Sequence, residues 1–320
     1  MSNLGAQDPH VTGFIEAAAD DVDDDDNGYA DSTLGTDELR YQMYHHIEGI
    51  SRKASPVPVS QREIDRLNLK HHLTRLLFDG KLHFAPIPKS PQRILDVGTG
   101  SGKWAVDADI APLQPTVIPP NLEFLLQHDY NNADWNLPRN TFDLVFSRWN
   151  HLYIADWRAF LRHAYTLLRP GGHVEFHEEL HGYHSDDETY TPQTNLYRWA
   201  ARCREAMLRF PGREVDLTAE EIVSYMREAG FVGVVVRCYK VPLNGWPKDE
   251  KYKEIGRLHQ AQLLMMVEDG TKILLKKALE VGEEESMGLV KLAMTDMKSR
   301  AIHAYQKVYV IYGRKPESAF

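Results

Sequence analysis

Four residues at alternating positions form the motif whose types and spacing point most clearly to chemistry. Asp96, Gly98, Gly100 and Gly102 lie two positions apart in the segment DVGTGSG. A glycine-rich turn between a strand and a helix lets a ligand approach the backbone closely, with the N-terminus of the helix behind it. The short apolar run 93–97 leads into this turn, so the sequence predicts a strand that delivers the glycines to a ligand site.

Three classes of ligand compete for such a turn. A Walker A loop needs a glycine five residues before Gly102, and that position is Val97. It also needs Ser or Thr after Lys103, where the chain has Trp104, so this reading fails. A dinucleotide fingerprint starting at Gly98 needs glycine at 103, which weakens NAD binding but leaves it open. The remaining pattern, D-x-G-x-G-x-G, closes over a ligand without a pyrophosphate.

The elements that must position this turn alternate along the chain. Helical patterns separate short apolar runs, which predicts a doubly wound α/β sheet. The candidate strands are 93–97, 122–126, 144–146, 174–176, 232–236 and 308–312. Ser60 and Thr218 each open a capping box, and Asp156 is placed to cap a third helix. Residues 251–300 are largely helical by pattern, which predicts a helical insertion over about 248–300 before the last strand.

The charge of the chain is concentrated at its start. The 320 residues have a formal net charge of −9, and residues 1–39 hold eleven acids and no Lys or Arg. Without that segment the other 281 residues carry +2, so nothing in the charge balance suggests nucleic-acid binding. The run Asp20–Asp26 repels itself and is poor in apolar residues, which predicts a disordered acidic leader over 1–39.

No run of 18 apolar residues and no secretory signal is present, and Cys203 and Cys238 do not form a disulfide framework. These features predict a protein of the cytoplasm or nucleus with no membrane contact.

Beyond the glycine turn, a series of segments is similar to a known family. The D-x-G-x-G-x-G pattern resembles motif I of class I S-adenosylmethionine-dependent methyltransferases, and the wider pattern resembles the LaeA-like methyltransferases of fungal secondary metabolism. The segments that carry this resemblance are 71–73, 79–83, 85–88, 92–102, 111–115, 117–121, 142–148, 156–157, 168–172, 174–176, 244–248, 253–256, 303–305 and 312–316. The resemblance covers roughly residues 41–320 and implies one methyltransferase domain over 40–320, with a Rossmann-like sheet.

The resemblance also implies a cofactor, S-adenosylmethionine, and a set of residues that bind it. The glycines line its methionine side, Asp109 matches the acid that accepts hydrogen bonds from the ribose, and Asp129 matches the position near the adenine amino group. Ser147 and Arg148 end the fourth strand of the family, where the transferable methyl group lies. The expected cofactor-binding residues are Asp96, Gly98, Gly100, Gly102, Asp109, Asp129 and Ser147.

Methyl transfer from a sulfonium needs mainly alignment and exclusion of water, and it needs a base only when the acceptor must lose a proton. His151 follows a strand at the edge where ligands bind in open α/β sheets, so it is the first candidate for this base. His177, Glu178 and His303 are further candidates near the same edge. No His, Cys and Asp cluster has the spacing of a metal site, so none is expected.

One departure from the family pattern concerns the cofactor site directly. The acid that binds the ribose usually follows the glycine turn by about 20 residues, beyond a helix and a second strand. Gly102 and Asp109 are seven positions apart, a span of about 10 Å as helix, which leaves no residues for a strand. We therefore expect the sheet to lack its usual second strand, and the chain to bind S-adenosylmethionine much more weakly than an intact relative, or not at all.

The function expected from this sequence is S-adenosylmethionine-dependent methyl transfer to a small-molecule intermediate of fungal secondary metabolism. The alternative is a non-catalytic regulator with a methyltransferase fold that acts through protein partners, and the acidic leader suits such a partner. An NAD-dependent oxidoreductase is a third option, against which Lys103 argues. The sequence does not identify the acceptor molecule or its acceptor atom.

Overall fold

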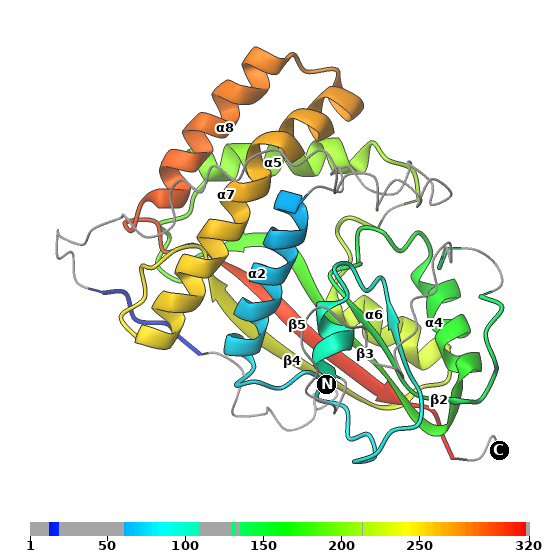
Figure 1. Cartoon of the computed structure of the whole chain (residues 1–320). Helices are drawn as coiled ribbons and strands as arrows, with labels where there is room; N and C mark the ends of the chain where they lie inside the picture. Colours follow the sequence, from blue (N-terminus) through cyan, green and yellow to red (C-terminus); the bar gives the residue numbers. More distant parts are fainter. Residues whose placement is uncertain (1–12, 19–60, 109–129, 132–134, 213, 318–320) are drawn as a thin grey trace, which may run out of the picture.

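A five-stranded sheet forms the centre of the computed structural model (Figure 1). The structure describes residues 13–18, 61–108, 130–131, 135–212 and 214–317. The strands are β1 (Ile94–Val97), β2 (Phe142–Arg148), β3 (Leu168–His184), β4 (Val232–Pro242) and β5 (Tyr305–Arg314). Their order is β1-β2-β3-β5-β4, with parallel pairing of β1, β2 and β3 and antiparallel pairing of β5 with both neighbours. The doubly wound α/β class predicted from the sequence is confirmed.

The register brings the carboxyl ends of β1 and β2 beside the middle of β3. Val97 lies opposite Ser147, and Ser147 lies opposite Phe176. Six of the seven residues of β2 are buried, as expected for a parallel strand that is covered on both faces. The glycine turn after β1 therefore lies beside the residues that follow β2 and close to the middle of the much longer β3.

Helices α4 (Trp157–Leu167) and α6 (Ala219–Glu228) cover one face of the sheet. Both begin where the sequence predicts. The Asp156 side chain accepts a hydrogen bond from Ala159 N at 2.8 Å, and Thr218 forms both bonds of a capping box with Glu221. Their apolar stripes pack on the sheet in one core cluster that includes Trp157, Phe160, Phe176, Ile222 and Ile311.

Helices α2 (Gln61–Leu77) and α3 (Lys103–Ala108) and the first part of α7 (Glu250–Leu279) cover the other face (Figure 1). Phe78 and Tyr239 belong to the core between α2, α7 and the sheet. Trp104 stacks on Phe146 with ring centroids 3.8 Å apart, which ties α3 to β2. The element after the glycine turn is therefore anchored to the sheet by one aromatic pair.

A helical layer extends beyond the sheet, at the top of Figure 1. It consists of α5 (Asn195–Leu208), the second part of α7 and α8 (Glu283–Lys298), which share an apolar cluster around Trp199, Val267 and Met297. The helical character predicted for 251–300 is confirmed. Helix α5 was not expected from the sequence. Among the described helices, none is long and apolar enough to cross a membrane.

Several expected features differ from the structure or lie outside it. Strands β3, β4 and β5 are longer than the sequence indicates, because β5 pairs with both β3 and β4 along its whole length. Within the described residues β1 pairs only with β2, while the candidate strand 122–126 lies outside them. Six residues of the leader, 13–18, are described, and Ala17 forms a bridge with Pro247. The rest of segment 1–39 is outside the described residues.

Candidate cofactor and methyl-transfer site

The glycine loop between β1 and α3 is built on three positive φ angles. Gly98, Gly100 and Gly102 have φ values of 72°, 60° and 75°, a region that residues with a side chain rarely adopt. The Gly102 N–H donates to the carbonyl of Thr99 at 3.0 Å and closes the turn. The spacing of the motif thus corresponds to the three positions where the backbone reverses its hand.

The carboxyl group of Asp96, directly before the loop, supplies the observation that fits a cofactor. Its Oδ2 atom is buried and has no hydrogen-bond partner among the described residues. Burial raises the pKa of Asp96 to about 6, although the nearby Thr99 hydroxyl and Arg148 guanidinium lower it. A buried acceptor without a donor costs free energy, which a bound donor recovers. The amino group of S-adenosylmethionine is such a donor, so the residues present fit this cofactor.

Asn150 braces the loop from the end of β2. Its Nδ2 donates to the carbonyl of Val97 at 2.9 Å and to Ser147 Oγ at 3.0 Å. A Cβ atom added to Gly98 would lie 2.4 Å from the same Nδ2, so the amide fills the space that a side chain would need. Ser147, expected beside the methyl group, is fully buried and supports Asn150.

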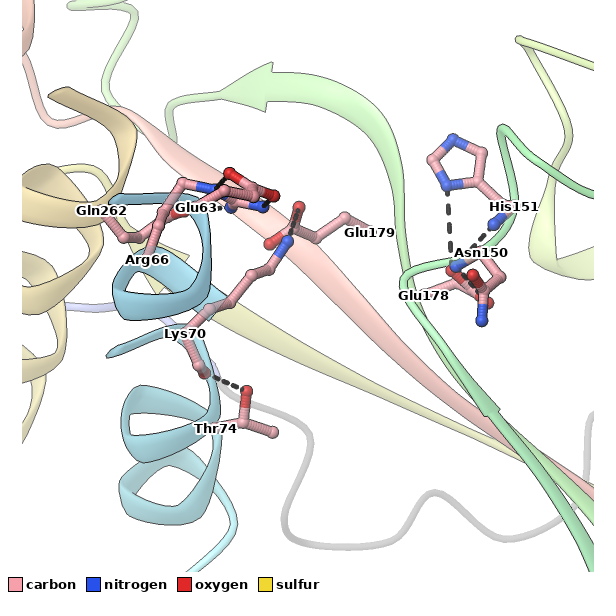
Figure 2. A network of polar contacts seen from close by, with 9 residues as sticks. All are labelled: Glu63, Arg66, Lys70, Thr74, Asn150, His151, Glu178, Glu179 and Gln262. Atoms are coloured by element: carbon pink, nitrogen blue, oxygen red, sulfur yellow. Dashed lines mark hydrogen bonds and ion pairs between the residues drawn. The ribbon is translucent and has the colours of Figure 1, made fainter. Parts of the chain in front are cut away.

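Two consecutive carboxylates of β3 contact different neighbours of the site, one the turn after β2 and the other helix α2 (Figure 2). Glu178 accepts hydrogen bonds from the backbone N–H groups of Asn150 and His151, each at 3.2 Å. Glu179 pairs with Lys70 of α2, whose Nζ lies 3.0 Å from Oε2. Adjacent residues of a strand point in opposite directions, so β3 holds the turn after β2 on one side and α2 on the other.

His151, the predicted base, lies in the turn after β2 beside Glu178. Its Nδ1 lies 3.8 Å from Glu178 Oε2, and its side chain is 15% exposed, whereas Glu178 is fully buried. The histidine therefore reaches solvent or a ligand, while the carboxylate stays behind it. Both oxygens of Glu178 accept hydrogen bonds from backbone N–H groups.

Helix α2 lies over the glycine loop with the face that carries Leu67, His71 and Arg75. A Cβ atom at Gly100 would lie 3.6 Å from Leu67 Cδ1, which is van der Waals contact. His71 Nε2 and Arg75 Nη1 lie 3.0 and 2.9 Å from Asp107 Oδ2. These contacts fasten α2 to α3, the helix that follows the loop.

The end of β2 joins this contact through Arg148. Its Nη2 lies 3.0 Å from His71 Nδ1, and because arginine only donates, His71 accepts there and donates from Nε2 to Asp107. Burial and the charge of Arg148 lower the pKa of His71 to about 4, so the imidazole is neutral. Burial also lowers the pKa of Arg148 to about 10, against the attraction of Asp96 and Asp107.

Other predicted residues lie elsewhere. The expectation that His177 lies at the mouth of the site is wrong: its side chain is buried among core aromatic rings, with Nε2 2.6 Å from Glu175 Oε1. His303 pairs with Asp187 and packs on Trp246. Asp109 and Asp129 lie outside the described residues. Of the described residues, no three or more of the His, Cys, Asp and Glu side chains are grouped to hold a metal ion.

Sequence reasoning missed Asn150 and the face of α2 that covers the loop. Leu67, His71 and Arg75 recur every four residues, a spacing that places them on one side of a helix. That periodicity was the signal for a shared role. Asn150 had a weaker signal, its position directly before His151 in the turn after β2.

The described residues also enclose a cavity of about 730 Å³ away from the loop. Residues 13–16, the end of α2, the middle of β4 and the start of α7 line it. None of the described residues predicted for the site is among its lining residues, so it does not belong to the cofactor site.

The fold and this site together define a class of protein: an open α/β sheet with a strained glycine loop and an unsatisfied carboxylate at the carboxyl end of β1. Residues 69–236 match the family model described as a methyltransferase domain. The chain belongs to this methyltransferase family. This membership confirms the enzyme class and S-adenosylmethionine as the methyl donor.

The chain is also similar to curated fungal proteins. It is 29% identical over 335 residues to the methyltransferase pytC of Aspergillus terreus, with 99% of this chain and 100% of the relative covered. It is 32% identical to the probable methyltransferase tdiE of Emericella nidulans, covering 79% and 82%. It is 29% identical to the secondary metabolism regulator LAE1 of Cochliobolus heterostrophus, covering 86% and 94%. These relatives confirm the LaeA-like resemblance.

Proposed function

We propose that this protein transfers the methyl group of S-adenosylmethionine to a small molecule of fungal secondary metabolism. The observation that carries this proposal is the buried Asp96 oxygen without a partner, directly before a loop of three positive-φ glycines. Relatives named as methyltransferases, pytC and tdiE, support the choice of a transferase.

The bound cofactor supplies a methyl group that its sulfonium charge has already activated. The chain's own residues then have three tasks. Asp96 binds the amino group of the cofactor, the glycines let its methionine part approach the backbone, and Leu67 of α2 supplies an apolar contact beside Gly100. Because an in-line displacement depends on alignment, the rigid placement of the loop by Asn150 contributes directly to the rate.

An acceptor that must lose a proton needs a base, and His151 takes this role in the proposal. Imidazole is a common general base in enzymes, and the Nδ1 atom of His151 lies 3.8 Å from the Glu178 carboxylate, which orients the ring. We expect His151→Gln to lower the rate constant of methyl transfer by about a hundredfold while changing cofactor affinity less than twofold. An unchanged rate would assign the proton to another group or to the solvent.

The adenosine part of the cofactor is assigned to Asp109 and Asp129, on the ribose and adenine respectively, by the resemblance of the sequence. Asp129→Ala is expected to weaken S-adenosylmethionine and its demethylated product, S-adenosylhomocysteine, to the same degree, because both contain adenosine. Calorimetry with the two ligands tests this placement. A loss confined to one of them would show that Asp129 does not contact the adenine.

The proposal as a whole is tested by calorimetry with S-adenosylmethionine and by comparing the metabolites of a deletion strain with those of the wild type. Binding, together with a metabolite that lacks one methyl group in the deletion strain, supports methyl transfer. If the protein does not bind S-adenosylmethionine even at millimolar concentration, an enzymatic function is excluded.

A second candidate is a regulator with this fold, and the similarity to LAE1 over most of both chains favours it. In that case the acidic leader binds a protein partner, and the deletion strain changes the amounts of many metabolites without the loss of a single methylation. A leader truncation that reproduces the deletion phenotype while cofactor binding is retained would favour the regulator.

A further inference from the structure

The turn after β2 holds a bulky residue in a backbone conformation that it rarely adopts. Trp149 has a φ angle of 62°, in the left-handed region. Its N–H donates to the carbonyl of His177 at 3.0 Å, so the turn is tied to β3 from its first residue. A conformation of this kind persists only where the surrounding contacts impose it.

Glu178 supplies two of these contacts. The carboxylate has no exposed surface, and its two oxygens accept the backbone N–H groups of Asn150 and His151 (Figure 2). Two backbone donors that follow a positive-φ residue thus converge on one buried anion. Since both oxygens are engaged and shielded, Glu178 has no oxygen available for a substrate.

The turn passes this constraint to the cofactor loop through one side chain. Asn150 donates to the carbonyl of Val97, the residue before Gly98, and its amide carbon and both terminal atoms would lie 2.4–2.7 Å from a Cβ at Gly98. The amide therefore fixes the carbonyl at the entry to the loop and occupies the space beside its first glycine.

We infer that Glu178 and Asn150 are positioning residues of the methyl-transfer site. Glu178 holds the turn 149–151, and Asn150 in that turn holds the backbone of Val97 and Gly98. The two residues thereby set the orientation of the loop toward the cofactor without touching the reacting atoms. This inference rests on the proposed function.

The protein supplies a matched control at the other end of the same strands. Asp143 is also a buried carboxylate that accepts two backbone N–H groups, from Gln92 at 2.6 Å and Arg93 at 3.0 Å. It holds the start of β1, whereas Glu178 holds the turn beside the end of β1. Asp143→Asn and Glu178→Gln remove the same kind of anion from opposite ends of the parallel strands.

The experiment measures affinity for S-adenosylhomocysteine by calorimetry, melting temperature, and amide hydrogen exchange of residues 97–102 in the full chain. Glu178→Gln and Asn150→Ala are expected to lower the affinity about tenfold, because each loosens hydrogen bonds that hold the loop. Both should accelerate exchange at 97–102. Asp143→Asn should lower the melting temperature about as much as Glu178→Gln does. Its affinity for S-adenosylhomocysteine should stay within about twofold of the unmodified protein, and its hydrogen exchange at 97–102 should be unchanged.

A double-mutant cycle isolates the contact between the two strand ends. Gly98→Ala is expected to abolish binding when Asn150 is present and to cost much less in the Asn150→Ala background, since the atoms that the new methyl group would meet are gone. Additive effects would overturn the inference. So would folded Glu178→Gln and Asn150→Ala variants with unchanged affinity and exchange, or an equal loss of affinity in Asp143→Asn.

The two proposals fail in different ways. If the unmodified protein does not bind S-adenosylhomocysteine, the proposed function fails, and hydrogen exchange in the ligand-free protein still decides the inference. Faster exchange at 97–102 in Glu178→Gln and Asn150→Ala, but not in Asp143→Asn, supports the positioning role. Equal exchange in all of these proteins overturns it.

Discussion

The two ends of the parallel strands differ in how completely their polar groups are satisfied. At the start of β1 and β2, Asp143 accepts hydrogen bonds from Gln92 N and Arg93 N and pairs with Arg169 at 2.5 Å. Burial raises the pKa of Asp143, but these three donors outweigh it and hold the pKa below its usual range. Nearby, Lys315 Nζ donates to Asn140 and to the carbonyls of two further residues.

At the carboxyl ends of β1 and β2, polar groups are left without hydrogen-bond partners. Asp96 has a buried oxygen without a partner and a raised pKa, and Trp149 has a positive φ angle. The guanidinium of the half-buried Arg148 has a hydrogen bond only with His71 among the described residues. The Asp96 oxygen without a partner costs free energy, whereas both oxygens of Asp143 are hydrogen-bonded.

This difference indicates which end of the parallel strands binds a ligand. The satisfied end contributes stability, and the end with the unsatisfied carboxylate is preorganised for a charged ligand that is not part of the chain. In this view Asp143 and Asp96 are two buried carboxylates with opposite tasks. Variants that exchange or remove these tasks test the comparison.

The largest expected effect comes from filling the glycine loop. Gly100→Val should lower affinity for S-adenosylhomocysteine at least about a hundredfold, because the branched side chain takes space beside Leu67 and strains a φ angle of 60°. Gly182→Val is the matched control: Gly182 has the same φ angle and no atom within 4 Å. Both variants should lose about 1–2 kcal/mol of stability from strain, and only Gly100→Val should lose binding.

Unchanged binding in a folded Gly100→Val variant, or an equal loss in Gly182→Val, would remove the loop from the site and with it the contrast between the two ends.

The next effect concerns the spacing between Gly102 and Asp109. The alignment with pytC spans 335 residues, which exceeds the 320 of this chain, so the relative has segments without a counterpart here. Inserting the segment of pytC that follows its glycine loop should raise affinity for S-adenosylmethionine by about tenfold or more. A Gly/Ser insertion of the same length is the control. Micromolar affinity and turnover in the unmodified chain would contradict this prediction and place Asp109 on the ribose.

A smaller effect is expected at the satisfied end. Asp143→Asn should lower the free energy of unfolding by about 2–3 kcal/mol at pH 7, because a charged acceptor of three donors is lost. Since the pKa of Asp143 is lowered in the folded protein, its contribution is present above the unfolded pKa of about 3.9 and is lost as the pH falls through the folded value. Denaturant unfolding at pH 7 and pH 3 measures this, and equal losses at both pH values would contradict it.

The parts of this molecule that could be predicted from the sequence depend on local signals. Asp156 and Thr218 mark helix starts because a cap acts within one turn, and both helices begin there. The glycine loop is recognisable because its backbone has a positive φ angle at three alternate residues, and each of them is a glycine.

The parts that were missed depend on pairing between distant residues. Strand β3 continues through polar residues because it pairs with β5 up to His184 opposite Tyr305, a partner that the local pattern does not reveal. His71 had no visible partner in the sequence, yet the fold brings it to Asp107, 36 positions away, and Arg148, 77 positions away. The helical signal locates α2, and only the packed sheet shows what it covers.

A change in stability of the opposite sign is expected from Asp96→Asn. Because the pKa of Asp96 is about 6 in the folded protein and about 3.9 in the unfolded chain, ionising this group penalises the folded state above pH 6. An amide of the same shape avoids the penalty. The ligand-free variant should therefore be more stable than the unmodified protein by about 1–3 kcal/mol at pH 7.5, even with the attraction of Arg148 counted, and should lose this advantage near pH 4.

The same substitution should weaken S-adenosylhomocysteine about tenfold at pH 7.5, since the amino group of the ligand then meets a neutral amide instead of a carboxylate. In the unmodified protein, affinity should fall as the pH decreases through 6, and in Asp96→Asn this dependence should be absent. Thermal unfolding and calorimetry at pH 7.5 and pH 5 separate the two effects. A variant that is less stable without ligand, or that binds as tightly as the unmodified protein, would show that Asp96 is a structural carboxylate like Asp143, and the two ends of the sheet would then not differ in kind.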